Sequence, residues 1–148
     1  MATYNATDLN AKPLWSGDCG NMGIFYGTYT GTPATGDVWR LCKLPAGAKV
    51  IRITLINADL GTAAPADFGF LPVDGSTVDA AGVATVDADA FLNDQALGTA
   101  STGTIAYFAD APVNIPRTSY AALTFGTIDT GASGKVSCII ECELFGAK

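Results

Sequence analysis

Side chains that could carry out catalysis are scarce in this sequence. It contains no histidine, so Ser/His/Asp and Cys/His mechanisms lack their general base, and the usual metal ligand is missing. A cysteine nucleophile would need a thiolate stabilised by a neighbouring Lys or Arg. Cys42 precedes Lys43, but adjacent residues of a strand point to opposite faces. We therefore expect a protein that is not an enzyme and needs no cofactor.

Carboxylates are the remaining candidates for acid–base chemistry. In extended backbone, the pair Asp87 and Asp89 and the pair Glu141 and Glu143 would each be ~6.7 Å apart along the strand. That separation suits a glycosidase pair, but such a site also needs a deep cleft with aromatic walls. The favoured interpretation is a solvated face without a catalytic role.

A calcium ion is an alternative for the acidic residues of the small, Gly/Ala-rich stretch from 74 to 89. Its carboxylates are oxygen donors on an expected loop, and they belong to Asp74, Asp79, Asp87 and Asp89. Their spacing does not match an EF-hand, which requires a central glycine and a terminal glutamate. The sequence leaves open whether this loop binds calcium.

The cysteines fit a structural role better than a zinc site. They are Cys19, Cys42, Cys138 and Cys142, with no CxxC pair among them. On the strand expected at 136–144, Cys138 and Cys142 would share a face with Val136, Ile140 and Leu144. Four residues of strand span ~13 Å, which is too far for a disulfide between these two. We expect both to be buried thiols.

Frequent glycine and proline, together with β-branched runs, favour short strands over helices. In the segment 24–30, Phe25 and Tyr29 face opposite to Ile24 and Tyr26. Strands are expected at 24–30, 38–44, 50–56, 67–73, 104–109, 120–128 and 136–144. Seven or eight such strands with turns between them indicate a sandwich, jelly roll or barrel.

Two local patterns predict more detail. The turn at 45–48 indicates that 38–44 and 50–56 form an antiparallel pair, with Ile51, Ile53 and Leu55 on the inward side. Residues 89–97 could form one or two helical turns, capped by Asp87 or Asp89 and ended by Gly98.

The N-terminal segment 1–18 is expected to be an extended arm preceding a β-sandwich domain at 19–148. The arm has no clean period but contains apolar residues that could bind a partner, namely Tyr4, Leu9, Leu14 and Trp15. The alternative is that this segment folds back onto its own domain.

Charge limits the classes of partner. The net charge is −6, only 15% of residues are charged, and the eight basic residues are scattered, so nucleic-acid binding is not expected. No apolar run approaches the ~20 residues of a membrane helix, and the N-terminus lacks a signal-peptide pattern. We expect synthesis and use in a cytoplasm, and a surface that other proteins can approach closely.

Several stretches together resemble the small decoration (cement) proteins of tailed bacteriophage capsids. The resemblance is carried by residues 38–51, 57–61, 68–71, 120–124 and 131–136, from Val38-Trp39-Arg40 to Gly134-Lys135-Val136. It implies an all-β, single-domain, jelly-roll-like sandwich with at most one short helix. It also implies a homo-oligomer, with a trimer favoured over a dimer, that is made in the host cytoplasm. This oligomer would bind the major capsid protein on the outer surface of the virion and stabilise it.

A tail-fibre or adhesin-like module that binds a host glycan is the alternative function. It would require a groove of exposed aromatic side chains, such as those of Trp39, Tyr107 or Tyr120.

Overall fold

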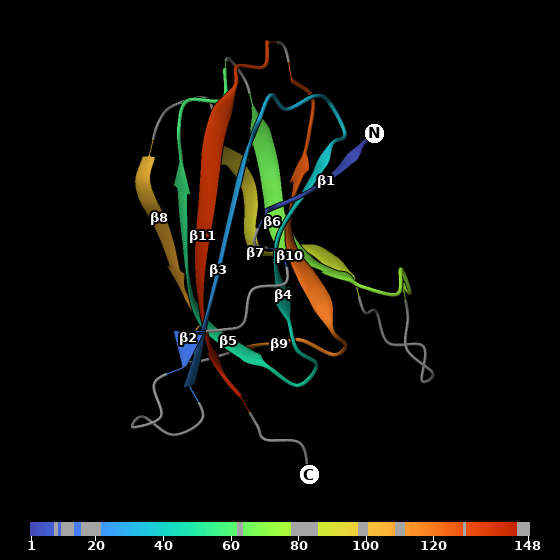
Figure 1. Cartoon of the computed structure of the whole chain (residues 1–148), viewed down its shortest axis with the longest axis vertical. Coiled ribbons are helices and arrows are strands. Elements are labelled where there is room, and N and C mark those ends of the chain that lie inside the picture. The colour runs from blue at the N-terminus through green and yellow to red at the C-terminus, as the bar shows by residue number, and fades with distance from the viewer. Residues whose placement is uncertain are drawn as a thin grey trace.

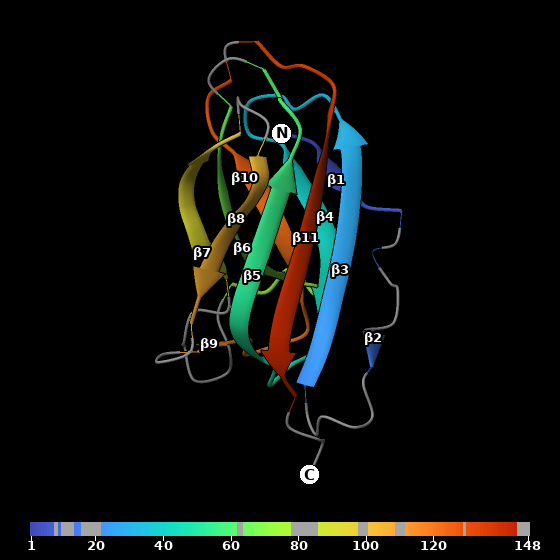
Figure 2. The same ribbon diagram turned by 90° about the vertical axis from the view of Figure 1, so that its left-hand side faces the viewer.

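The chain folds into two β-sheets packed face to face (Figures 1 and 2). The computed structural model describes residues 1–7, 9, 14–15, 22–61, 64–77, 86–97, 101–108, 112–128 and 130–144. Sheet A has the order β1 (Thr3–Asn5), β4 (Val38–Leu44), β10 (Ser119–Phe125), β6 (Pro65–Pro72), β7 (Asp87–Ala96). Sheet B has the order β2 (Leu14–Trp15), β3 (Met22–Gly31), β11 (Gly134–Glu143), β5 (Lys49–Asn57), β8 (Ser101–Tyr107), and β9 (Val113–Asn114) also pairs with β5.

The order of the eight longer strands is that of a jelly-roll-like sandwich. Numbered along the chain, they form one sheet β3-β11-β5-β8 and one sheet β4-β10-β6-β7. Among these eight described strands, the chain thus changes sheet after nearly every strand, and only β6 and β7 follow each other along the chain as neighbours in one sheet. All pairs of longer strands are antiparallel. The predicted all-β single-domain sandwich is confirmed. Seven of the eight longer strands overlap the predicted segments, β7 was not predicted as a strand, and β1, β2 and β9 are short additions.

The helix predicted at 89–97 is wrong, because this segment belongs to β7. Pairing with β6 places Phe91 against Phe68, with ring centroids 5.3 Å apart, and leaves the Phe91 side chain buried. Asp94 has a φ of 48°, a left-handed conformation that interrupts a right-handed helix. Its backbone N–H donates to Asp67 Oδ1 at 2.8 Å. A partner strand distant in sequence therefore overrides the local helical pattern. Across all described residues the structure contains no helix, and hence none that could span a membrane.

The antiparallel pair predicted between 38–44 and 50–56 does not form. The turn after β4 carries the chain from sheet A to sheet B, where β5 pairs with β11 and β8. Gly47 in this turn has a φ of 79°, and its N–H donates to the Ile115 carbonyl at 2.8 Å. Leu44 and Val50 are both fully buried, because each enters the core from its own sheet.

A β-bulge changes the inward face predicted for β5. Ile53 and Leu55 are fully buried as expected, but Ile51 is only half-buried. The pairing with β11 skips Ile51, since Arg52 lies opposite Glu141 whereas Val50 lies opposite the next residue. The extra residue of a bulge reverses the alternation beyond it, so Val50 takes the inward position.

The predicted inward face of β11 is confirmed. Val136, Cys138, Ile140 and Cys142 are all fully buried, and Leu144 is partly buried against the same core. Cys42 is also a buried thiol, whereas Cys19 lies outside the described residues.

Candidate interaction surfaces

The first six residues extend sheet A. β1 runs parallel to β4, with the Val38 N–H donating to the Ala2 carbonyl and the Ala6 N–H donating to the Arg40 carbonyl, both at 2.8 Å. The Ala2 N–H also donates to Oδ1 of the buried Asp37 at 2.9 Å. This part of the predicted arm lies along its own sandwich.

Tyr4 begins a row of aromatic rings that leads from the surface into the core. Its side chain is 37% exposed, and its ring centroid lies 5.8 Å from that of Tyr29. Tyr29 in turn contacts Trp39 at 4.6 Å, and Trp39 contacts Phe125 at 4.7 Å. Partial burial, with smaller effects of Tyr4 and Asp37, raises the pKa of Tyr29. Tyr4 therefore has one ring face on its own domain and part of its surface open.

The other predicted arm residues lie near the same edge of the sandwich. Leu9 is buried, with its N–H donating to the Ala6 carbonyl at 3.2 Å. Leu14 and Trp15 form β2, which adds to the β3 edge of sheet B and places Leu14 opposite Ile24. β1 and β2 thus flank β4 and β3, the neighbouring edge strands of the two sheets. Contact of this segment with a partner protein remains a prediction.

The outer face of β3 carries exposed apolar side chains. Ile24 and Tyr26 are 37% and 43% exposed, while Phe25 between them is buried. Tyr26 lies opposite the half-buried Ile139 of β11. We call Ile24, Tyr26 and Ile139 the β3 patch. It lies on the face of sheet B that is turned toward the viewer in Figure 2.

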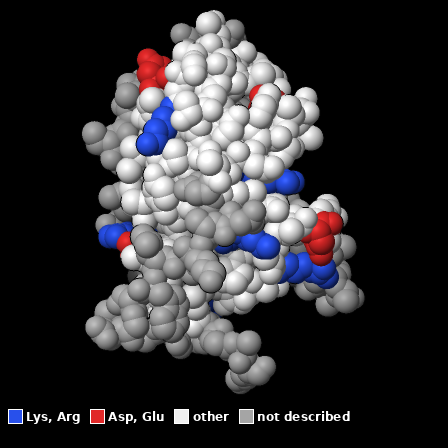
Figure 3. Space-filling model, viewed as in Figure 1, with Lys and Arg blue, Asp and Glu red and all other residues white. Residues whose placement is uncertain are grey.

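Few charges accompany this patch. Glu141, opposite Ile24, forms an ion pair with Arg52 of β5, which neutralises both side chains. Most of the described surface on the adjoining face of the molecule is also uncharged (Figure 3). A partner covering such a surface would have to dehydrate few ions.

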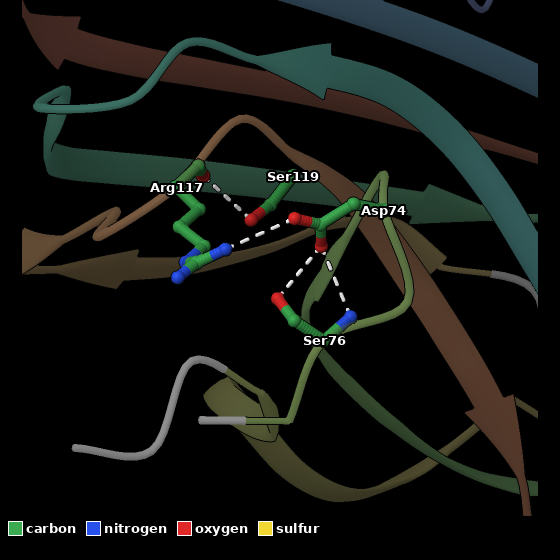
Figure 4. A network of polar contacts seen from close by, with 4 residues as sticks. All are labelled: Asp74, Ser76, Arg117 and Ser119. Carbon is green, nitrogen blue, oxygen red and sulfur yellow. Dashed lines mark hydrogen bonds and ion pairs between the residues drawn. The ribbon is translucent and has the colours of Figure 1, made fainter. Parts of the chain in front are cut away.

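A shallow hollow lies beside the turn that follows β6. Its volume is about 480 Å³, and it is lined by Lys43, Ala46, Val73, Asp74, Pro116, Arg117 and Thr118. Figure 4 shows how the walls are held: Arg117 Nη1 lies 3.0 Å from Asp74 Oδ2, while Ser76 donates to Asp74 Oδ1 through its N–H and hydroxyl. The Ser119 hydroxyl donates to the Arg117 carbonyl at 2.7 Å.

The Asp74 carboxylate links the turn after β6 to the segment that contains Arg117. Its pKa is lowered, whereas a general acid that works near neutral pH needs a raised pKa. Hydrogen bonds from Ser76, and then the Arg117 guanidinium, hold the pKa of its carboxyl below the usual range. No local pattern in the sequence indicates this network, because Asp74 and Arg117 are 43 residues apart.

The candidate catalytic residues do not form a reactive site. Cys42 is buried while Lys43 is exposed, so the lysine does not face the thiol. Asp87 and Asp89 are exposed and hydrogen-bonded to each other. Partial burial and then Asp89 raise the pKa of Asp87, whereas Asp87 and Asn93 lower the pKa of Asp89. The two carboxyl groups therefore act on each other, and Asn93 Nδ2 donates to Asp89 Oδ2 at 2.8 Å.

Metal ligands do not converge in the part of the chain that the structure describes. Within it, no three Cys, Asp or Glu side chains lie close enough to hold an ion. Asp79, one of the four predicted calcium ligands, lies outside the described residues.

Trp39 cannot contribute to the aromatic groove that the glycan-binding alternative would require. This side chain is fully buried between Tyr29 and Phe125. Tyr120 is half-buried, with the Arg40 guanidinium carbon 4.7 Å from its ring centroid, and the side chain of Tyr107 lies outside the described residues.

Comparison with known proteins identifies structural neighbours only. No family model matches the sequence, and no curated protein matches it. A chain in the capsid of Ralstonia phage GP4 superposes with a TM-score of 0.68 at 21% identity, covering 100% of both chains. A chain in the capsid asymmetric unit of cyanophage Pam1 gives 0.61 at 23% identity, covering 89% of this chain and 91% of that one. A chain in the acidic stable capsid of Helicobacter pylori bacteriophage KHP30 gives 0.52 at 11% identity, covering 88% and 91%. The jelly-roll-like sandwich described above is therefore a fold that occurs in the capsid structures of bacteriophages.

Proposed function

We propose that this chain is a non-enzymatic structural protein of a bacteriophage virion that decorates the outer capsid surface and stabilises the shell. The observation that carries the proposal is the match to a chain of the Ralstonia phage GP4 capsid, which covers all of both chains. Two chains that superpose over their whole lengths are similar in size. A capsid structure thus contains a polypeptide that is comparable to this small sandwich in both size and fold.

The surface chemistry supports a role in binding proteins. The 22 charged side chains share 7551 Å² of accessible surface, or about one charge per 340 Å². The proposed partner is the major capsid protein, bound by a homo-oligomer of this chain, with a trimer favoured over a dimer. Synthesis in the host cytoplasm would precede attachment to the capsid.

We place the capsid contact at the β3 patch and the adjoining N-terminal segment. Ile24 and Tyr26 are among the most exposed large apolar side chains of the described residues, and strand pairing brings Leu14 next to Ile24. Tyr4 adds exposed aromatic surface on the neighbouring edge strand. Burying one such side chain fully contributes about 1.5–3 kcal/mol, so two would change affinity by roughly a hundredfold.

Rebinding to capsids stripped of their surface proteins tests the proposal. Electron microscopy of rebound particles should show added density of 15.1 kDa per chain on the outer surface. The variant Tyr26→Glu should fold normally but bind at least about tenfold more weakly, because it places an unpaired charge in a covered surface. Val73→Glu is the matched control, since Val73 is 38% exposed and lies in the loop after β6, away from sheet B.

The outcomes separate the possible contacts. Normal binding of Val73→Glu together with weak binding of Tyr26→Glu supports the β3 patch. The reverse result would move the contact to the hollow beside Val73. No association of the wild-type chain with any stripped capsid would overturn the decoration role itself.

A further inference from the structure

The backbones of the two sheets nearly touch at one point between β3 and β4. A Cβ atom on Gly27 would lie 2.0 Å from the carbonyl oxygen of Leu41 and 3.1 Å from the backbone nitrogen of Cys42. Facing sheets are usually about 10 Å apart, and so close an approach requires a residue without a side chain. Gly27 therefore permits an unusually narrow separation beside Cys42.

Two cysteines meet at this point, one from each sheet. Gly27 pairs directly with Cys138 of β11, and Cys138 Sγ lies 3.9 Å from Cys42 Sγ. The two residues are 0% and 3% exposed. A disulfide has an S–S distance of about 2.05 Å, so the sulfurs need to approach by roughly 2 Å. Closing the bond therefore requires rotation about the χ1 angles of the two facing cysteines.

We propose that Cys42 and Cys138 are a latent cross-sheet disulfide site, which remains as two thiols during synthesis and is joined when a disulfide oxidant becomes available. One thiolate attacks a small-molecule disulfide such as oxidised glutathione, forming a mixed disulfide and releasing one small thiol. The second thiolate then attacks the protein sulfur of that mixed disulfide, closing the Cys42–Cys138 bond and releasing the second small thiol. The two protein protons end on the released thiols, and two electrons reduce the external disulfide.

A disulfide between Cys42 and Cys138 would link the two sheets and stabilise the folded chain. It would connect β4 of sheet A with β11 of sheet B across a sequence separation of 96 residues. Closing so long a loop restricts the unfolded chain and stabilises the folded one. A reducing cytoplasm keeps the thiols apart, whereas an oxidising environment outside the cell favours the bond. This inference concerns the chain alone and does not depend on binding to a capsid.

A variant with only the two proposed cysteines tests the site. Cys19→Ser and Cys142→Ala are combined, and the protein is exposed to oxidised glutathione both in its native state and during refolding from urea. We expect an intact mass lower by two hydrogens, a proteolytic peptide pair joined through Cys42 and Cys138, and a higher melting temperature than that of the reduced protein. Refolding is included because buried thiols react only when the structure opens.

Matched variants and the wild-type chain complete the experiment. Adding Cys42→Ala or Cys138→Ala to the same background should abolish the joined peptides and make the melting temperature insensitive to reductant. Disulfide-linked peptides of the oxidised wild-type chain are identified in parallel. They test for the Cys42–Cys138 bond even if the background variant folds poorly. Joined peptides involving Cys19 or Cys142 instead, or no Cys42–Cys138 link after either treatment, would overturn the proposal.

Discussion

Ile53 and Ile56 lie on the same strand but face opposite sides of sheet B. Ile53 is fully buried opposite Ile140, whereas Ile56 is half-buried on the outer face. We expect Ile53→Ala to lower the free energy of unfolding by about 2–5 kcal/mol, because it leaves a cavity in the core. The matched change Ile56→Ala should cost about 1 kcal/mol or less. Urea denaturation measures both, and a loss below about 0.5 kcal/mol for Ile53 would contradict the observed register.

Gly27 tolerates no side chain where β3 meets β4. A Cβ atom there would overlap the carbonyl group of Leu41, and backbone atoms cannot move aside as a flexible side chain can. Gly27→Ala should therefore destabilise the protein by about 3 kcal/mol or more. Gly126→Ala is the control, since its Cβ would lie 3.3 Å from the Pro65 ring and 3.6 Å from the Pro65 carbonyl oxygen, without the backbone overlap found at Gly27. Similar thermal melting of the two variants would show that the sheets can separate without cost.

Cys142 makes folding sensitive to alkaline pH. Burial, with a smaller effect of Glu141, raises the pKa of its thiol from 9.0 to about 12. Between these values the unfolded chain releases a proton that the folded chain retains, so this contribution is complete below pH 9.0 and is lost as pH rises toward 12. The slope is about 1.4 kcal/mol per pH unit.

The variant Cys142→Ala isolates this effect. It should lose less stability than the wild type between a pH of about 8 and a pH of about 10, because other titrating groups are common to both proteins. Equal losses in urea denaturation would show that the thiol is not protected from ionisation.

Local sequence patterns predict individual strands better than their partners. The bounds of β4 and the buried face of β11 agree with the alternation of their own residues. The wrong helix at 89–97 and the missing pair of β4 with β5 have one physical cause. Partner strands outside the local segment, β6 for β7 and β11 for β5, provide the backbone pairing that the local patterns do not predict.

The sequence predicts the β3 patch only in part. Alternation separated Ile24 and Tyr26 from Phe25 and Tyr29, but both faces are apolar, so it did not show which one is buried. Glycines at 23 and 27 share the face of Phe25 and were the available signal, because close approach between sheets requires small residues. No comparable signal exists for the hollow, whose walls come from separate loops.

The N-terminal strand should contribute to stability whether or not it also contacts a partner. Deleting residues 1–6 removes the hydrogen bonds of β1 to Val38 and Arg40 and the ring contact of Tyr4 with Tyr29. We expect a loss of about 2–3 kcal/mol, which lowers the melting temperature by roughly 5–10 °C. Tyr4→Ala, which retains the backbone pairing, should have a smaller effect. Unchanged melting after the deletion would show that β1 does not pair with β4 in solution.

Carboxylates of sheet A lie on an edge strand, where they limit strand-to-strand aggregation. β7 is the last strand of sheet A on the side away from β1, and its exposed residues include Asp87, Asp89 and Asp94. Carboxylates on an edge strand discourage further strand pairing. At the opposite edge, β1 and β2 cover β4 and β3. These two edges are thus protected, and the β3 patch on a sheet face is the apolar surface that we propose for a partner.

A contact made through the β3 patch should be insensitive to salt. Raising the ionic strength from about 0.1 M to about 1 M shortens the Debye length from ~10 Å to ~3 Å and weakens exposed ionic contacts. Burial of Ile24 and Tyr26 has no such dependence, so the dissociation constant for stripped capsids should change less than about threefold. Melting curves at both salt concentrations control for changes in folding. Binding that weakens more than about tenfold in high salt would indicate an ionic contact, such as one through Arg117 beside the hollow.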